Sequence, residues 1–203
     1  MSIMSNIVII KYNAGNIKSV KNALYRLGAN AEITADHEKI TNADKVVFPG
    51  VGEASTTMKY LHSQNLDKLI INLKQPVLGI CLGLQLMCSH SEEGNTRCLG
   101  IFNEKVRRFV PDAGKEFITK VPHMGWNSVC NLKGPLFSEK MEHKYVYFVH
   151  SYYAGLGIHT AAECNYIISF SAALRKDNFF ATQFHPEKSG SIGSAILENF
   201  LKL

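Results

Sequence analysis

The segment with the clearest chemical potential is Gly79-Ile80-Cys81-Leu82-Gly83, which places a thiol between two glycines. It lies where the apolar run 77–80 meets a helical pattern that begins at Leu82. A nucleophile at such a strand-to-helix turn forms a nucleophile elbow, here with cysteine in place of serine. The glycines permit a tight turn, and the N–H groups of the following helix favour a thiolate and a developing oxyanion. The pattern therefore predicts that Cys81 is a nucleophile.

A cysteine nucleophile requires a base and a group that orients this base. Phe184-His185-Pro186-Glu187-Lys188 offers both. Proline biases the residue before it toward an extended conformation, so His185 and Glu187, two positions apart, can project to the same side. His185 also ends a predicted strand, at the edge where open α/β sheets place their sites. We therefore expect the Glu187 carboxylate to orient the His185 imidazole toward Cys81.

Each of these features also has a purely structural interpretation. A buried cysteine is more often a small core side chain, and a lone His-Pro-Glu sequence can be a solvent-exposed turn. The two features together favour catalysis. His123 and His150 can line the site, although a lone histidine in a strand is more often a hydrogen-bonded core residue. The core interpretation holds for the remaining thiols, which lack flanking glycines: Cys88, on the same helix as Cys81, and Cys98, Cys130 and Cys164.

Gly50-Val51-Gly52 follows another apolar run and is a candidate source of backbone N–H donors beside the nucleophile. Its alternative interpretation is a plain strand-to-helix turn. The segment lacks the further glycines, the lysine and the hydroxyl residue of phosphate-binding loops. No pair of histidines has the helical spacing of metal ligands, so we expect neither a metal nor a cofactor.

The pattern around these residues alternates short apolar runs with amphipathic helical stretches. Such alternation is typical of β-α-β units around a mostly parallel sheet with helices on both faces, an α/β fold. Asn16 stands at the N-cap position of the first helix, and Gly28 at its C-terminal end. The predicted elements of this half are strands at 7–10, 29–34, 46–48 and 77–80, and helices at 17–27, 54–62 and 66–73.

The second half is richer in strands, predicted at 104–110, 145–152, 166–170 and 179–185, with a closing helix at 192–203. It indicates an added, more antiparallel portion. No repeat or linker divides the chain, so we expect residues 1–203 to form one domain.

Composition supports this interpretation. The chain has 203 residues, 46% of them hydrophobic, and a net charge of +5 that is spread along the chain, so we expect no binding to nucleic acid. No secretion signal opens it, and the uncharged tract 75–91 contains a proline and two glycines, so we expect no membrane association. Five cysteines without a C-x-x-C pair favour the reducing cytoplasm.

With these residues, the chain resembles the class I, or triad, glutamine amidotransferases, and within that family the glutaminase subunits of imidazole glycerol phosphate synthase. The resemblance covers essentially the whole chain. PHMGWN and HPEKSG are the segments most specific to this subunit. The motifs that carry the resemblance are YNAGN at 12–16, PGVG at 49–52, GICLGLQ at 79–85, HSEEG at 90–94, PHMGWN at 122–127, YFVHSY at 147–152 and QFHPEKSG at 183–190.

The resemblance implies that Cys81 attacks the side-chain amide of L-glutamine, with His185 as acid and base and Glu187 orienting it. A thioester forms, ammonia leaves, and water releases glutamate. The family pattern implies that the N–H of Leu82 and one from Val51 and Gly52 meet the oxyanion. It also implies residues that hold the amino-acid end of the substrate, which match Gln85, Glu93, Ser151 and Tyr152.

The resemblance further implies a partner, a TIM-barrel cyclase that consumes the ammonia. Positions that match the family's interface are Asn16, Tyr147 and Lys188. Many relatives carry Asp-Tyr-Gly where this chain has Lys11-Tyr12-Asn13. Two alternatives stay open at this stage: a paralogous glutaminase that supplies a different synthase, for example in surface-sugar assembly, and a catalytically silent scaffold subunit.

Overall fold

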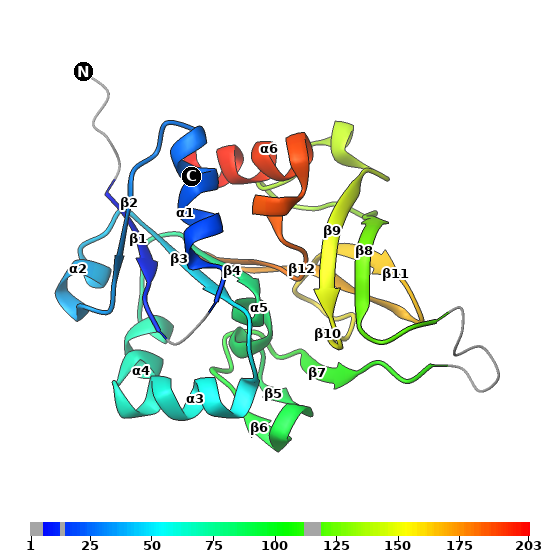
Figure 1. The fold of residues 1–203 in the computed structure, drawn as a ribbon, viewed down its shortest axis with the longest axis horizontal. Helices are drawn as coiled ribbons and strands as arrows, with labels where there is room; N and C mark the ends of the chain where they lie inside the picture. Colours follow the sequence, from blue (N-terminus) through cyan, green and yellow to red (C-terminus); the bar gives the residue numbers. More distant parts are fainter. Residues whose placement is uncertain (1–5, 13–14, 112–118) are drawn as a thin grey trace.

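The computed structural model describes residues 6–12, 15–111 and 119–203. Within this part of the chain, helices cover both faces of a seven-stranded sheet with the order β11-β12-β13-β4-β3-β1-β2 (Figure 1). The strands from β13 to β2 run parallel, and β12 and β11 extend the sheet in antiparallel fashion. The predicted α/β class, mostly parallel with an added antiparallel portion, is confirmed.

The strands of this sheet are β1 (Ile7–Ile10), β2 (Ala31–Thr34), β3 (Lys45–Gly50), β4 (Val77–Cys81), β11 (Thr160–Asn165), β12 (Ser169–Lys176) and β13 (Phe179–Thr182). The helices are α1 (Ile17–Arg26), α2 (His37–Thr41), α3 (Ala54–Ser63), α4 (Leu66–Ile71), α5 (Leu82–Met87) and α6 (Gly190–Leu201). Short 3₁₀ turns are η1 (Glu93–Asn95), η2 (Glu139–Met141) and η3 (Pro186–Lys188). None of the helices in the described ranges is long and apolar enough to cross a membrane.

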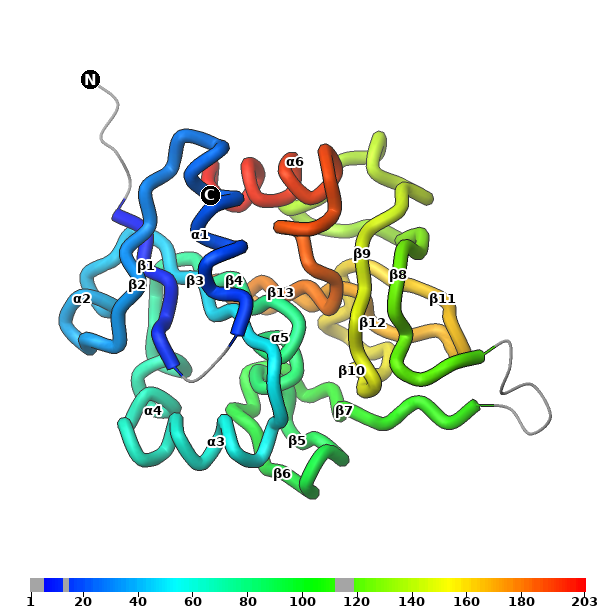
Figure 2. Tube along the Cα trace, in the orientation of Figure 1, coloured from blue at the N-terminus to red at the C-terminus, as the bar shows by residue number. Residues whose placement is uncertain are grey.

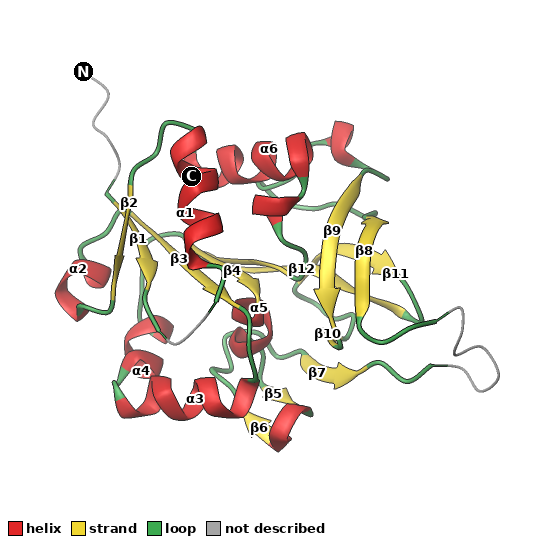
Figure 3. Ribbon diagram, in the orientation of Figure 1, coloured by secondary structure: helices red, strands yellow, loops and turns green. Residues whose placement is uncertain are grey.

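Two smaller strand groups flank the main sheet (Figure 3). One is a four-stranded sheet with the order β10-β7-β5-β6. The other is the hairpin of β8 and β9, in which His123 pairs with His150 and Trp126 pairs with Tyr147. The strands of these groups are β5 (His90–Ser91), β6 (Thr96–Arg97), β7 (Lys105–Arg108), β8 (His123–Ser128), β9 (Tyr145–His150) and β10 (Tyr152–Ala154).

The centre of the main sheet is buried on both faces, which explains why its inner parallel strands are apolar runs, whereas the edge strand β2 is only partly buried. In β1, Ile7 and Ile9 pack into the core cluster that includes residues of α1 and α6. Val8 and Ile10 pack into the opposite cluster, with residues of α3, α4 and α5. The two clusters fix the sheet between its helices, and the carboxyl ends of β3 and β4 therefore hold constant positions for the site.

The structure differs from the sequence prediction in the antiparallel portion. The predicted strand at 145–152 is broken at Ser151, and its two parts, β9 and β10, belong to different strand groups. Strands β8 and β11 were not predicted, and the predicted strand at 166–170 is shifted to Ser169–Lys176. β8 contains Gly125, and the buried positions of β11 are small residues, so neither segment has a strong apolar period.

Two local predictions about helix ends are also corrected. Asn16 precedes α1 but has a left-handed φ of 69° and makes no side-chain cap hydrogen bond. Its side-chain amide instead donates to Glu187 Oε1. Helix α5 ends at Met87, so Cys88 is not part of the helix that follows Cys81. Cys88 is nonetheless buried, and its thiol donates to the Leu84 carbonyl oxygen at 3.4 Å.

Candidate active site

Cys81 is the last residue of β4 and stands directly before α5. Its φ of 54° and ψ of −105° form a strained conformation that residues other than glycine rarely adopt. The neighbouring glycines allow the backbone of β4 and α5 to pack closely against its surroundings. A Cβ on Gly83 would lie 2.0 Å from the Phe48 carbonyl oxygen, and one on Gly79 would lie 3.1 Å from the Gly83 backbone. The structure thus has the predicted elbow, with the strain concentrated on the nucleophile itself.

The Pro49–Gly52 segment runs beside this elbow. Gly50 pairs in register with Cys81 across the adjacent strands β3 and β4, so Val51 and Gly52 follow next to the nucleophile. The hydroxyl of Tyr12, two residues after β1, donates a hydrogen bond to the Pro49 carbonyl oxygen. Burial, together with the nearby Cys81, raises the pKa of Tyr12, so this hydroxyl remains a neutral donor. Tyr12 belongs to the YNAGN motif, but no role for its hydroxyl was predicted from the sequence; its neighbour Asn13 lies outside the described residues.

His185 and Glu187 lie in direct contact. The distance between His185 Nδ1 and Glu187 Oε1 is 2.7 Å, and both side chains are buried. Burial alone would lower the pKa of His185, but its interactions with Cys81 and Glu187 outweigh burial and raise this pKa well above the usual value. A protonated imidazole beside the sulfur favours the thiolate form of Cys81. The geometry therefore suits a thiolate–imidazolium pair that is oriented by a carboxylate.

Strand β9 holds the turn that carries this pair. The backbone N–H of His185 donates to the Tyr147 carbonyl oxygen at 2.9 Å. The Ser189 hydroxyl donates to the His185 carbonyl oxygen at 2.7 Å and accepts from the Tyr147 N–H at 2.9 Å. Ser189 is buried and was not singled out from the sequence, although it belongs to the HPEKSG motif. These bonds fix His185 relative to the β8–β9 hairpin.

The three residues expected at a partner interface surround the same turn. Asn16 donates its side-chain amide to Glu187 Oε1, so it touches the carboxylate that orients His185. The Lys188 ammonium lies over the Tyr147 ring, 5.9 Å from its centroid. Tyr147 in turn meets Trp126 edge to face, with 6.1 Å between the ring centroids. The structure therefore brings Asn16, Tyr147 and Lys188 together beside the buried pair.

A cavity of about 320 Å³ opens at Cys81. All four residues expected to hold a substrate line it together with the expected oxyanion donors. Its wall consists of Val51, Gly52, Cys81, Leu82, Gln85, Glu93, Pro122, Val149, His150, Ser151 and Tyr152. Glu93 Oε2 accepts from the Ala54 N–H at 2.8 Å, and burial raises the pKa of its carboxyl group. The cavity has the size and the polar groups of a site for a small amino acid.

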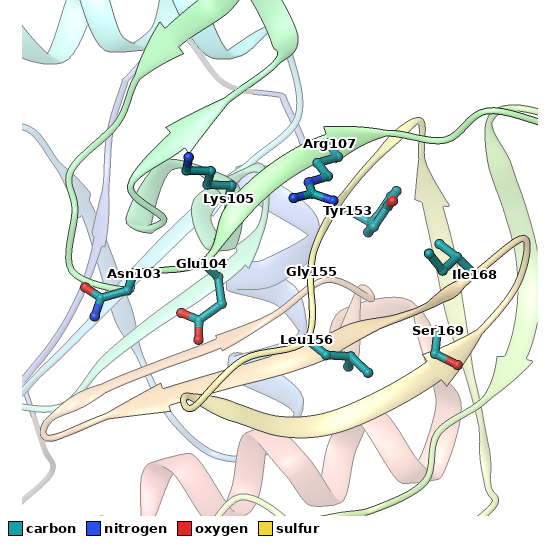
Figure 4. A pocket seen from close by; sticks show the side chains of 9 residues that line it. All are labelled: Asn103, Glu104, Lys105, Arg107, Tyr153, Gly155, Leu156, Ile168 and Ser169. Carbon is teal, nitrogen blue, oxygen red and sulfur yellow. The ribbon is translucent and has the colours of Figure 1, made fainter.

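A larger cavity of about 660 Å³ lies between β7, the loop after β10 and the start of β12 (Figure 4). The described residues that line it include neither a cysteine nor a histidine. Its buried carboxylate, Glu104, is already paired with His159 Nδ1 at 2.8 Å. Across residues 6–12, 15–111 and 119–203, no three His, Cys, Asp or Glu side chains gather in a group that could hold a metal ion. The residues that line the two cavities therefore favour the smaller one, at Cys81, as the active site.

Comparison with known proteins agrees with this geometry. The family model described as "Glutamine amidotransferase class-I" matches residues 8–203. A protein of Bacteroides fragilis (strain YCH46) named "Imidazole glycerol phosphate synthase subunit HisH" is 59% identical over 197 residues, covering 97% of this chain and 99% of the relative. The protein of the same name from Haemophilus influenzae (strain 86-028NP) is 48% identical over 200 residues, with 98% of each chain covered.

Solved structures show the same fold at low sequence identity. One titled "Crystal structure of glutamine amidotransferase" has a TM-score of 0.73 at 18% identity, covering 96% of this chain and 97% of the other. Another, titled "Structure of PurLQS from Thermotoga maritima", has a TM-score of 0.70 at 13% identity, covering 98% and 99%. The family match includes the elbow, the cavity and the His-Pro-Glu turn, and this chain belongs to the class I glutamine amidotransferase family, among the HisH proteins.

Proposed function

We propose that this chain is the glutaminase subunit of an imidazole glycerol phosphate synthase, which hydrolyses glutamine and passes the ammonia to a partner subunit. The observation that carries the proposal is the position of Cys81 on a strained elbow, in the lining of an amino-acid-sized cavity and close enough to the His185–Glu187 pair to raise the pKa of His185. The full-length similarity to proteins named HisH supports the choice of synthase.

In the first half of the reaction, the Cys81 thiolate attacks the carboxamide carbon of glutamine. A C–S bond forms, and the carbonyl electrons move to the oxygen. Backbone N–H groups of Leu82 and of Val51 or Gly52 stabilise this oxyanion. The His185 imidazolium then donates its proton to the amide nitrogen, the C–N bond breaks, and ammonia leaves behind a glutamyl thioester.

In the second half, neutral His185 takes a proton from water, and the resulting hydroxide attacks the thioester carbon. The C–S bond breaks, glutamate leaves, and the thiolate is restored beside the protonated imidazole. Glu187 stabilises the imidazolium throughout, as the carboxylate does in serine-dependent triads. Burial of the pair keeps water from screening this interaction.

The four remaining polar wall residues suit the other end of the substrate. Glu93 provides a carboxylate for the ammonium group of glutamine. Gln85, Ser151 and Tyr152 lie on the same wall and supply polar groups for the substrate's amino-acid end. Together they orient the carboxamide toward Cys81, and orientation of this kind accounts for much of the rate enhancement of enzymes.

A TIM-barrel cyclase is the proposed recipient of the ammonia. Free ammonia becomes ammonium in neutral water and loses its nucleophilic lone pair, so direct transfer between docked subunits protects it. The outer face of the β8–β9 hairpin exposes the large side chains of Met124, Trp126 and Tyr145, next to the half-buried Tyr147 and its contact with Lys188. Exposed apolar patches of this kind mark protein interfaces. We place this reaction in the cytoplasm, where Cys81 stays reduced.

Glutamate release, measured with and without the cyclase and its ligand, tests the proposal. We expect weak activity for the chain alone, strong activity in the complex, and loss of activity in Cys81→Ser. Cys88→Ser is the matched control, because that buried thiol lies outside the cavity. Equal activity of wild type and Cys81→Ser would refute the assignment of the nucleophile. A complex that uses free ammonia but never glutamine would support a scaffold instead.

The choice of synthase is tested separately by genetic complementation. A strain that requires histidine because it lacks its own glutaminase subunit should grow when it produces this chain with the matching cyclase. Growth that depends on Cys81 supports the proposal. Failure to rescue, together with glutaminase activity in vitro, would favour a paralogue that supplies another synthase.

A further inference from the structure

Gln183 is a fully buried residue between β13 and the His-Pro-Glu turn, and it contacts the nucleophile directly. Its side-chain Nε2 lies 3.7 Å from Cys81 Sγ, within the range of a hydrogen bond to sulfur. Its Oε1 accepts from Gln85 Nε2 at 3.1 Å. The same Gln85 nitrogen donates to the Tyr152 carbonyl oxygen at 3.0 Å. Two buried amides therefore connect the wall of the cavity to the sulfur.

The direction of each hydrogen bond follows from the Tyr152 carbonyl, which can only accept. The Gln85 amide must turn its nitrogen toward this carbonyl, and that nitrogen then donates to Gln183 Oε1 as well. Gln183 is left with its nitrogen facing the sulfur. The orientation of Gln183 is thus set by a backbone group and does not depend on a free choice of amide rotamer.

A pair of histidines fixes the Tyr152 carbonyl from the other side. His150 Nδ1 donates to it at 2.7 Å, so His150 Nε2 is an acceptor and receives the Nδ1 proton of His123 at 3.0 Å. His123 Nε2 in turn accepts from Asn127 Nδ2 at 3.3 Å. Burial lowers the pKa of His150 to about 3 and that of His123 to about 4, so both rings stay neutral, as this directed chain requires.

We propose that Gln183 is a catalytic hydrogen-bond donor to Cys81 Sγ that stabilises the thiolate, and that Gln85 and the His150–His123 pair hold it in position. The role rests on the proposed glutaminase function. A hydrogen bond to a charged acceptor is about twice as strong as one to a neutral acceptor, so Gln183 favours the thiolate over the thiol. The Val149 carbonyl, 3.9 Å from the sulfur, can accept only from the protonated thiol and favours the opposite state.

Titratable side chains from several elements lie near the sulfur. His185 and its partner Glu187 come from the turn after β13, Tyr12 follows β1, His150 ends β9, and Glu93 lies on the cavity wall. Tyr12 and His150 are uncharged near neutral pH because burial shifts both of their pKa values in that direction. His185 is therefore the charged group that favours the thiolate, and Gln183 adds a neutral donor on a second side.

The decisive variant is Gln183→Glu in the full chain. Glutamate has nearly the same shape and retains an acceptor for Gln85, but its carboxylate cannot donate to the sulfur. The measurement is the rate at which iodoacetamide alkylates Cys81, followed by mass spectrometry of the Cys81 peptide as a function of pH. We expect the midpoint of this profile to rise by about one pH unit or more. An unchanged midpoint would overturn the proposal.

Gln183→Leu separates the lost donor from the added negative charge of Gln183→Glu. It should raise the midpoint in the same direction but less, and a midpoint equal to that of wild type would also overturn the proposal. His123→Phe tests whether the histidine pair helps to hold Gln183 in position. It should raise the alkylation midpoint by less than Gln183→Leu does, and an unchanged midpoint would refute the part assigned to the pair. The half-buried Cys130 serves as an internal control for folding, because its alkylation profile should stay unchanged in every variant.

Turnover provides a second readout in the complex with the cyclase. We expect Gln183→Leu to lower kcat about 10-fold with little change in KM, since the donor acts on the nucleophile and lies behind the cavity wall. Loss through KM alone would contradict a role at the sulfur. If wild type released no glutamate while the alkylation midpoint still shifted in the variants, the proposed function would fail and the donor role would stand.

Discussion

The backbone conformation of Cys81 serves catalysis at a cost in folding stability. Its left-handed φ of 54° turns the thiol toward the cavity, yet the same conformation costs of the order of 1–3 kcal/mol for a residue with a Cβ. The surrounding packing keeps the residue in place, because Gly83 lets α5 approach the Phe48 carbonyl. Strain at a nucleophile is a feature that catalysis retains and that stability alone would remove.

This strain predicts an unusual order of stability among variants at position 81. Cys81→Gly should be more stable than Cys81→Ala by about 1 kcal/mol, because glycine adopts positive φ without a steric penalty. At most buried positions alanine is the more stable of the two. Urea denaturation of both variants measures the difference, and a more stable alanine variant would show that the elbow is unstrained.

We expect a large loss of turnover when the carboxylate of Glu187 is replaced by an amide of the same shape. In Glu187→Gln the carboxylate charge is lost, so the pKa of His185 should fall and the imidazolium should be less stable in the transition state. We expect glutaminase kcat in the complex to drop by about 100-fold or more, with a smaller change in KM.

The matched control is Glu198→Gln, which removes a carboxylate from an exposed ion pair with Lys202 on α6. Its kcat should stay within a factor of two or so of wild type, since exposed pairs of this kind contribute little. Equal losses in the two variants would mean that Glu187 acts only through folding.

The start of helix α3 is joined directly to the cavity, because its cap residue Glu53 follows Gly52. Glu53 caps the helix, accepting from the backbone N–H groups of Ser55 at 3.1 Å and Thr56 at 2.8 Å. These hydrogen bonds, that with Ser55 foremost, lower the pKa of Glu53 to about 2. The cap anchors the end of the segment that contributes Val51 and Gly52 to the cavity.

The cap predicts a specific dependence of stability on pH. Because the folded pKa lies below the ordinary value of 4.5, the contribution of Glu53 is complete above pH 4.5 and is lost as the pH falls toward 2. Glu53→Ala should therefore cost about 1 kcal/mol at pH 7 and progressively less below pH 4.5. Urea midpoints at pH 7, 4 and 3 measure this, with Glu38→Ala on α2 as the control. A constant difference over this range would exclude the charged cap.

The elements that the sequence predicts well are those whose signals are local. The parallel strands are apolar runs bounded by turns, and the elbow and the His-Pro-Glu turn are contiguous motifs. Strands β8 and β11 pair with the next strands along the chain, β9 and β12, but their own residues show no clear apolar period, so no local signal marks them. Gln183 and Asn16 gain their contacts to Cys81 and Glu187 only when segments about 100 or more residues apart meet.

At the scale of the whole molecule, two buried histidines set a limit on stability in acid. The pKa values of His123 and His150 are lowered from 6.5 to about 4 and about 3, so the unfolded chain binds protons that the folded chain does not. Their contribution to stability is complete above pH 6.5 and falls as the pH decreases toward 4. His123→Gln should flatten the decline of the urea midpoint between pH 7 and 5.

His143 provides the control for this experiment, because its side chain is 77% exposed. His143→Gln should leave the slope of the decline unchanged. An equal flattening in both variants would show that the acid sensitivity does not come from the buried pair.

The hairpin face predicts how the chain meets its proposed cyclase partner. Trp126 is the single tryptophan of the chain and is 55% exposed at the centre of this face. Large aromatic residues at such positions dominate interface energies, so Trp126→Ala should weaken cyclase binding about 10-fold or more in titration calorimetry. Ile158→Ala, which removes an 85% exposed residue outside the hairpin face, should bind as wild type does. Equal binding by both variants would exclude this face from the interface.

The position of β13 has a consequence for how the protein is made. This strand lies in the middle of the sheet, between β4 and β12, although it is the last strand in the sequence (Figure 2). During synthesis the elbow residues leave the ribosome about 100 residues before His185 does. Until the final segment inserts next to β4, the nascent chain has a cysteine without its base. The order of the chain thus delays reactivity of the thiol until the segment that carries His185 has been made.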